Sequence, residues 1–116
     1  MYLIYQLRLI DNKHYFGTTW WERKAERMQE HINGRGSKWT ERFPPVDENP
    51  IVNQWLIYDR KKAYAFENAK CEQFLEEYGI DSTRGGNQNY GDVGNYSVWV
   101  RKHLRHLCPT DYDWQI

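Results

Sequence analysis

The opening segment of the chain constrains the fold most, because its pattern predicts a β-hairpin. Residues 2–10 alternate between buried-type and polar positions well enough to form a strand. Asp11-Asn12-Lys13 has the composition of a turn, and residues 14–18 are typical of the returning strand. The side chains expected to share one face of the first strand are Leu3, Tyr5, Leu7 and Leu9.

The register of this hairpin decides whether two of its tyrosines can act together. Tyr5 and Tyr15 point to the same face only if the numbers of paired residues sum to an even value. We therefore expect Ile10 to face His14 across a three-residue loop. A two-residue turn would pair Ile10 with Lys13 and send the tyrosines to opposite faces.

Helix signals follow the hairpin. Thr19-Trp20-Trp21-Glu22 has the spacing of a capping box, so a helix should run from there to Asn33-Gly34. Residues 37–43 favour a short second helix, which Pro44-Pro45 ends because proline cannot continue it. The face of the first helix expected to be buried comprises Trp21, Ala25, Met28 and Ile32.

The rest of the chain predicts one more strand and a long helix. Residues 51–58 form the third strand, and the longest helix begins at Asp59 or Arg60 and runs to Tyr78, with Gly79 as its stop. Residues 82–94 are rich in glycine and asparagine and are expected to form a loop. A final helix is expected from about residue 95 to residue 107.

This order of elements predicts the fold class. The sequence β-β-α-α-β-α plus a C-terminal helix indicates a small α/β (α+β) fold, with a three-stranded antiparallel sheet flanked by helices. The 116 residues suit a single domain. We expect its core at about residues 1–90 and a C-terminal extension at about residues 91–116.

Composition excludes several classes of protein. A chain with 40% hydrophobic and 16% aromatic residues has too much apolar material to be disordered. The longest apolar run covers only residues 2–5, so no membrane span is expected, and the polar N-terminus predicts no secretory signal. Cys71 and Cys108 are too few for a disulfide framework. An intracellular location is expected, the cytoplasm or, in a eukaryote, the nucleus.

Charge is unevenly distributed although the net charge is zero. Residues 1–42 hold eight Lys/Arg against five acidic residues, and residues 43–80 hold four against seven. A local positive lobe can bind a phosphate backbone even on a neutral molecule. The alternative is an ordinary solvated surface.

A short His103-x-x-His106-x-Cys108 cluster has the residue types of a metal site. The competing interpretation is a polar helix end, where His and Arg suit the helix dipole. A structural zinc site usually has four spaced ligands, which favours the second interpretation.

Arg27 and His31 stand one turn apart on the first predicted helix. They share a stripe with Trp20 and Lys24, beside the face expected to be buried but distinct from it. An arginine with an imidazole offers donors and a proton carrier, and a solvated stripe is the alternative. Arg27 should lower the pKa of His31, and a neutral His31 predicts activity that rises through about pH 6–7.

Glu67 lies on the apolar stripe of the long helix, in line with Ala63, Cys71, Phe74 and Tyr78. Burying a carboxylate is costly unless it is paired, hydrogen-bonded or bound to a metal. A functional carboxylate and a structural partner of an arginine are both open interpretations.

At this point the sequence resembles the GIY-YIG nucleases. Leu3-Ile4-Tyr5 followed by Tyr15-Phe16-Gly17 resembles their two-part signature, and Arg27-x-x-x-His31 is similar to the pair on their first helix. The resemblance continues over about residues 1–90 and keeps the order and spacing of the motifs. The further matching segments are Gly34-x-Gly36-Ser37-Lys38-Trp39-Thr40, Ala65-Phe66-Glu67 and Arg84-Gly85-Gly86.

Some positions depart from the family's pattern. Leu3 replaces the first glycine of the signature, and Phe16 replaces an isoleucine, both at positions that mainly pack. The family also carries an asparagine beyond its glutamate, for which Asn87 and Asn89 are the two candidates.

The resemblance implies metal-dependent hydrolysis of DNA phosphodiester bonds. It assigns catalytic roles to Tyr5, Tyr15, Arg27, His31 and Glu67, with Glu67 holding Mg²⁺ or Mn²⁺. Arg27 would brace the scissile phosphate, and Tyr5 would serve or assist the general base. The residues expected to contact DNA are Lys24, Arg35, Lys38, Trp39 and Arg84.

Two other functions stay open at this stage. A catalytically silent nucleic-acid-binding module would use the same basic lobe with aromatic residues for stacking. A protein-interaction module would use the Trp- and Tyr-rich surface as anchors. The presence of all five catalytic residue types favours the nuclease. A branched substrate, weak nicking of any duplex, and targeting by a partner protein are all compatible with the sequence.

Overall fold

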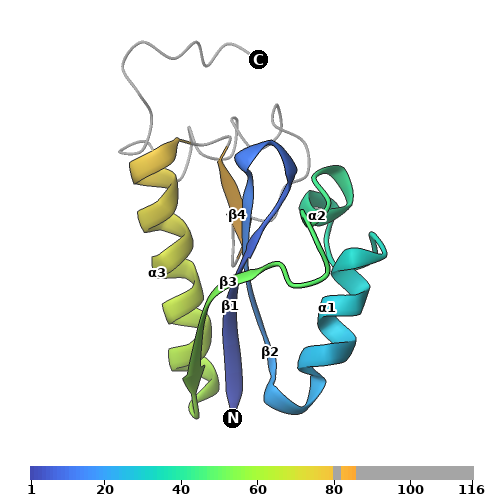
Figure 1. Cartoon of the computed structure of the whole chain (residues 1–116). Helices are drawn as coiled ribbons and strands as arrows, with labels where there is room; N and C mark the ends of the chain where they lie inside the picture. The colour runs from blue at the N-terminus through green and yellow to red at the C-terminus, as the bar shows by residue number, and fades with distance from the viewer. Residues whose placement is uncertain (80–81, 86–116) are drawn as a thin grey trace.

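A mixed β-sheet lies between helices on its two faces (Figure 1). In the computed structural model, residues 1–79 and 82–85 are described. Helices α1 (Lys24–Ile32) and α2 (Lys38–Arg42) lie on one side of the sheet, and α3 (Arg60–Tyr78) lies on the other. Within these residues no helix is long and apolar enough to cross a membrane. The predicted α/β (α+β) class is confirmed.

The sheet has one strand more than the sequence predicts. Strands β1 (Tyr2–Arg8), β2 (His14–Trp20), β3 (Ile51–Ile57) and β4 (Thr83–Gly85) are arranged in the order β3-β1-β2-β4. β1 pairs antiparallel with β2 and β3, whereas β4 pairs in parallel with β2. The expectation of three antiparallel strands is therefore wrong. β4 lies in a segment expected to be a loop, and pairing with β2 fixes it although its own composition is that of a turn.

The hairpin register has the predicted parity but a longer connection. Tyr5 pairs with Gly17 and Arg8 pairs with His14, so the two site tyrosines lie on the same face. The expected pairing of Ile10 with His14 is wrong, because residues 10–12 form a short 3₁₀ helix. Its two positive φ values, 58° at Asp11 and 57° at Asn12, fit residues that tolerate the left-handed region.

Helix α1 starts later than predicted and buries a different face. A 3₁₀ turn (Trp21–Arg23) precedes it, and in this stretch neither the turn nor the helix has a side-chain cap. The Thr19 capping box is therefore wrong, because Thr19 is a residue of β2. Met28 and His31 are the buried residues of α1, whereas Trp21 and Ala25 are exposed. The burial of His31 follows from polar partners described below, which an apolar pattern does not reveal.

Helices α2 and α3 begin and end at the predicted signals. The Ser37 hydroxyl accepts a hydrogen bond from the Thr40 backbone N–H, and the Thr40 side chain completes a capping box. Asp59 caps α3 through the backbone N–H of Lys62 at 2.8 Å, and Gly79 follows the last turn with a φ of 94°. The long helix therefore has the predicted bounds.

The buried stripe of α3 is confirmed at its first three positions. Ala63, Glu67 and Cys71 are buried as expected, but Leu75 takes the place predicted for Phe74. Tyr78 is 59% exposed, so its expected burial is wrong. An i, i+4 progression from residue 63 to residue 75 keeps the same side of the helix against the sheet.

The two faces of the sheet carry different packing. The face toward α1 and α2 holds an apolar cluster that includes Leu3, Leu7 and the fully buried Trp39. The face toward α3 is mainly aromatic, with Phe16 against Phe74 at 5.8 Å and Trp55 against Phe66 at 5.2 Å between ring centroids. Alternate residues of β1 and β2 therefore meet different helices.

Several sequence expectations fall outside the described residues. These are the C-terminal helix at about residues 95–107, the cluster of His103, His106 and Cys108, and the candidates Asn87 and Asn89.

Candidate active site

Two strands and one helix bring Tyr5, Tyr15 and His31 together. The Tyr5 hydroxyl on β1 lies 2.7 Å from His31 Nε2 on α1. The ring of Tyr15, from β2, is 5.0 Å from the His31 ring and 6.4 Å from the Tyr5 ring, measured between centroids. Tyr5 and His31 are both fully buried, and Tyr15 is 5% exposed. The three side chains therefore form a compact polar group inside the apolar cluster.

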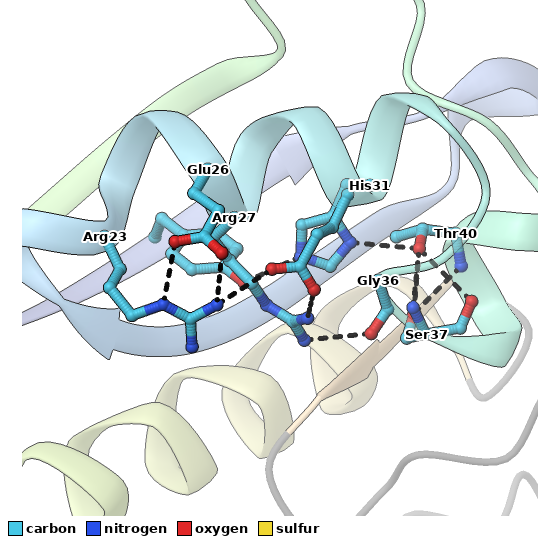
Figure 2. Close-up of polar contacts among 9 residues, drawn as sticks. Arg23, Glu26, Arg27, His31, Gly36, Ser37 and Thr40 are labelled. Carbon is cyan, nitrogen blue, oxygen red and sulfur yellow. Dashed lines mark hydrogen bonds and ion pairs between the residues drawn. The ribbon is translucent and has the colours of Figure 1, made fainter.

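The second nitrogen of His31 is held by the cap of α2. His31 Nδ1 lies 3.0 Å from Thr40 Oγ1 (Figure 2). The same oxygen accepts a hydrogen bond from the Ser37 backbone N–H at 3.2 Å and can donate its proton to the Ser37 carbonyl at 3.3 Å. We therefore assign the neutral tautomer with its proton on Nδ1, which donates to Thr40 and leaves Nε2 to accept from Tyr5.

Two glycines permit the close packing of these rings. A Cβ placed on Gly17 would lie 2.3 Å from the Tyr5 hydroxyl oxygen, and one on Gly36 would lie 2.0 Å from His31 Nδ1. Both positions need the absence of a side chain, rather than unusual backbone angles. The matching glycines of the sequence motifs therefore have a steric role in the site.

Arg27 stands beside this group and retains accessible surface. Its side chain is 24% exposed, and its guanidinium donates to Glu30 Oε2 at 3.1 Å and to the Gly36 carbonyl at 2.9 Å (Figure 2). The second bond ties α1 to the loop that precedes α2. Arg27 is thus the member of the group through which an anion could first make contact.

Burial keeps the two tyrosines in the phenol form. Burial raises the pKa of Tyr5 well above its ordinary value, and the neighbouring Tyr15 adds to this, although Arg27 acts in the opposite direction. Burial and the charge of Glu67 raise the pKa of Tyr15 to about 12. Both residues are therefore phenols at neutral pH, and each can donate a hydrogen bond.

The same burial keeps His31 neutral. Burial, and then the positive charge of Arg27, lower the pKa of His31 to about 3. The predicted downward effect of Arg27 is confirmed in direction. The expectation that His31 titrates through pH 6–7 is wrong, because the ring has no contact with water that would solvate its charged form.

Glu67 lies on α3, on the other side of the sheet, and acts on the tyrosines through its charge. It is 4% exposed, and its charge raises the pKa of Tyr15 and, more weakly, that of Tyr5. Burial and the same carboxylate raise the pKa of Cys71 one turn along the helix. The prediction that this carboxylate faces the packed interior is confirmed.

Glu67 fits a metal ion only as a single ligand. Over residues 1–79 and 82–85, no three His, Cys, Asp or Glu side chains form a group that could hold a metal. Mg²⁺ commonly binds one or two carboxylates and completes its shell with waters and phosphate oxygens. The donor set therefore fits a hard cation shared with a phosphate, and does not fit a cage made of protein ligands alone.

The residues expected to contact DNA divide into two groups. Arg35 and Lys38 are exposed, and Lys24 is partly exposed. Trp39 and Arg84, also expected to contact DNA, are fully buried, so neither side chain lies on the surface of this structure. The Trp39 indole donates to the His14 carbonyl at 2.9 Å, and the Arg84 guanidinium lies 4.1 Å from the centre of the Trp39 ring. Both residues are part of the interior packing.

The site lies where one edge of β2 opens. β4 pairs with His14, Tyr15 and Phe16 only, so in the described part of the chain no strand covers the outer edge of residues 17–20. Sequence reasoning includes Ser37 and Thr40 in a motif segment but misses their role in holding His31. Their Ser-x-x-Thr spacing is a capping signal, but the second residue is usually Glu or Gln, and nothing local shows that His31 is its partner.

Comparisons with known proteins leave the family open. No family model matches the chain, and no curated protein or solved structure matches it.

Proposed function

We propose that the chain is a metal-dependent endonuclease of the GIY-YIG type that hydrolyses phosphodiester bonds in DNA. One observation carries the proposal: Tyr5, Tyr15, Arg27 and His31 converge from two strands and a helix, with the charge of Glu67 reaching both tyrosines. Perturbed titrating groups that gather from distant parts of a sequence are typical of catalytic sites.

Arg27 would hold the scissile phosphate. Its guanidinium is already oriented by Glu30 and by the Gly36 carbonyl, so little freedom is lost when it binds an anion. The planar fork can donate to two phosphoryl oxygens, which carry more charge in the transition state. Arg27 would therefore act on the rate as well as on binding.

Tyr5 and His31 would move the proton of the attacking water as a relay. The Tyr5 hydroxyl donates to His31 Nε2, so Tyr5 can accept a proton from water as its own proton passes to His31. Burial is the larger cause of the lowered pKa of His31, and a phosphate bound at Arg27 would offset only the smaller contribution, from the charge of Arg27. Thr40 would hold the ring in the required tautomer.

Glu67 would hold Mg²⁺ or Mn²⁺ together with the phosphate. A bound divalent cation supplies Lewis-acid stabilisation of the charge that develops on phosphoryl and leaving oxygens. Glu67 is a buried residue of α3, so a regular helix rather than a flexible loop fixes its position.

Binding to the rest of the DNA would use exposed cations near the site. Arg35 and Lys38 flank the loop that Arg27 contacts, and Lys24 lies one turn before Arg27. Such contacts attract any phosphate backbone and carry no base sequence. Choice of a DNA target would then require a feature of DNA shape or a targeting partner protein.

A catalytically silent nucleic-acid-binding module is a second candidate, and burial favours it. Tyr5, Tyr15, His31 and Glu67 are each at most 5% exposed, as expected for a structural polar network. In that case the network stabilises the fold, and the exposed cations bind DNA without cleaving it.

Cleavage of supercoiled plasmid distinguishes the two candidates. We expect nicking by the wild-type chain in Mg²⁺ and none in EDTA. Glu67→Gln should lose the activity, whereas Glu76→Gln, an exposed position of the same helix, should keep it. Binding of DNA without cleavage, unaffected by Glu67→Gln, would support the silent module.

A further inference from the structure

A small pocket lies further along the open edge of β2. It has a volume of about 240 Å³ and is separate from the buried group described above. We call it the edge pocket. Its lining includes Tyr2, Thr18, Trp20, Arg23, Arg60 and Tyr64.

Aromatic rings form one wall of the edge pocket. Trp20 is 50% exposed, although its ring stacks on Tyr2 with centroids 4.4 Å apart and an angle of 28° between planes. The Tyr2 ring lies in turn 6.4 Å from the Tyr64 ring. A half-exposed indole held in place by a stacked neighbour can receive a planar ligand at little entropic cost.

Two arginines supply positive charge to the same pocket. Arg60 makes no ion pair among the residues described, and its guanidinium lies 5.8 Å from the centre of the Tyr64 ring. Arg23 contacts Glu26 and Glu30, but its side chain is 50% exposed, and exposed ion pairs exchange readily for other partners. The pocket is thus suited to a ligand with an anionic group and a flat ring.

A buried hydroxyl in the edge pocket supports this assignment. The Thr18 Oγ1 atom is shielded from solvent and has no hydrogen-bond partner in the described part of the chain. Buried polar atoms are nearly always hydrogen-bonded, because an unsatisfied one costs free energy. The lining of the edge pocket therefore contains an unsatisfied polar atom, which a ligand reaches only when a neighbouring side chain moves aside.

The edge pocket lies next to the proposed catalytic group. Arg23 precedes Arg27 by one turn at the start of α1, and Tyr64 precedes Glu67 by one turn on α3. One helical turn advances about 5.4 Å, so both lining residues stand about one turn from the proposed catalytic residues of their own segments. Thr18 follows Gly17, against which the Tyr5 ring packs.

We propose that the edge pocket binds the nucleotide next to the scissile phosphate. The base of this nucleotide leaves the DNA stack and lies against the Trp20 ring, and its phosphate lies between Arg23 and Arg60. This inference rests on the proposed function and names its substrate class. A base can enter the pocket only if it leaves the stack of a helix, which is least costly in an unpaired strand. The preferred substrate is therefore DNA with a single-stranded segment or flap beside the cut.

Binding in EDTA tests the edge pocket separately from cleavage. The probes are a labelled oligothymidylate and a labelled duplex of equal length. We expect Arg60→Ala and Trp20→Ala each to weaken binding of the single strand about ten-fold, because stacking and phosphate contacts are both lost. Duplex affinity should change by less than about two-fold. Lys61→Ala, an exposed neighbour with the same charge change, is the control.

Each outcome is informative. Equal effects of Arg60→Ala and Lys61→Ala, or equal wild-type affinity for the two DNAs, would overturn the edge-pocket proposal even if plasmid is cleaved. Selective loss of single-strand binding without any cleavage would keep the pocket and overturn the endonuclease. If the two variants give different results, the result of Arg60→Ala is the one that counts. Arg60 is at an exposed position, whereas the Trp20 ring packs on Tyr2.

Discussion

The two faces of the sheet each contain a histidine, and the two are held in different ways. His31 faces β1 from α1, is fully buried, and hydrogen-bonds to Tyr5 and Thr40. His14 lies on the opposite face, is partly exposed, and its Nδ1 is 3.1 Å from the Gln6 amide, which in turn accepts from Asn53. Its ring packs against Phe74 at 4.7 Å.

This difference separates the group that we propose to be catalytic from a group that joins strands. The hydrogen-bonded chain from His14 through Gln6 to Asn53 connects neighbouring strands of the sheet. It includes no phenol or carboxylate. The His31 network connects a strand, a helix and a capping loop, and lies beside Arg27 and the charge of Glu67. Burial lowers the pKa of both histidines, so a shifted pKa alone does not distinguish them.

The largest expected difference between the two faces is in DNA cleavage. His31→Ala should lower the rate of plasmid nicking by about 10²- to 10⁴-fold, because the proton relay through Tyr5 loses its acceptor. His14→Ala should leave the rate within a few-fold of wild type. Rates are compared at saturating DNA, with circular dichroism to check the fold. Equal losses in the two variants would remove the distinction between the faces.

A smaller effect is expected on stability when the space for the His31 ring is filled. Gly36→Ala places a methyl group against His31 Nδ1, and overpacking of this kind costs about 1–3 kcal/mol of unfolding free energy. Urea denaturation measures the cost. In NMR spectra the imidazole signals of His31 should shift while those of His14 stay in place. Shifts at both rings would indicate that the faces are coupled.

The pH dependence of stability should also separate the two histidines. The folded-state pKa of His31 is lowered to about 3 from 6.5, so the unfolded chain binds more protons between these values. The free energy of unfolding is therefore highest, as far as His31 is concerned, above pH 6.5. It falls by about 1.4 kcal/mol per pH unit as the pH is lowered from 6.5 toward 3.

Replacing the ring tests this slope. His31→Gln should reduce the fall in stability between pH 6.5 and pH 4, whereas His14→Gln, at a partly exposed site, should keep most of it. Unfolding free energies from urea titrations at several pH values give the comparison. An unchanged slope in His31→Gln would mean that the ring is solvated.

The smallest expected effect is on nonspecific DNA affinity. Lys38→Ala, beside the His31 network, should lower the slope of log affinity against log salt by about 0.9 or less, the value for one phosphate contact. Lys70→Ala is the matched change on the other face, where the ammonium lies over Trp55 at 5.3 Å, and should leave the slope unchanged. If the slope of log affinity against log salt were the same for the two variants, DNA would have no preference for one face of the sheet.

The sequence predicts elements whose signals are local. The bounds of α3 follow from Asp59 and Gly79, and the hairpin parity follows from alternation, so both are confirmed. The burial of Glu67 is also predicted, because a carboxylate in line with Ala63 and Cys71 has only one way to face on a regular helix.

Other features depend on partners that no local pattern reveals. Arg84 and Trp39 have the residue types of a DNA surface, yet they stack on each other in the interior. β4 forms from a glycine-rich segment because β2 offers it an unpaired edge. His31 is buried because Tyr5 and Thr40 satisfy both of its nitrogens, and this also removes the titration expected from its sequence context.

The central position of β1 has a consequence for how the protein is made. A ribosome releases β1 and β2 early, but the second edge of β1 has no partner until residues 51–57 have left the exit tunnel. At about 5–20 residues per second, synthesis from the end of β2 to the end of β3 takes about 2–7 s. During that time a nascent apolar strand offers unpaired backbone groups to other chains. Slower translation over residues 21–50 should therefore raise the aggregated fraction, and coexpressed chaperones should lower it.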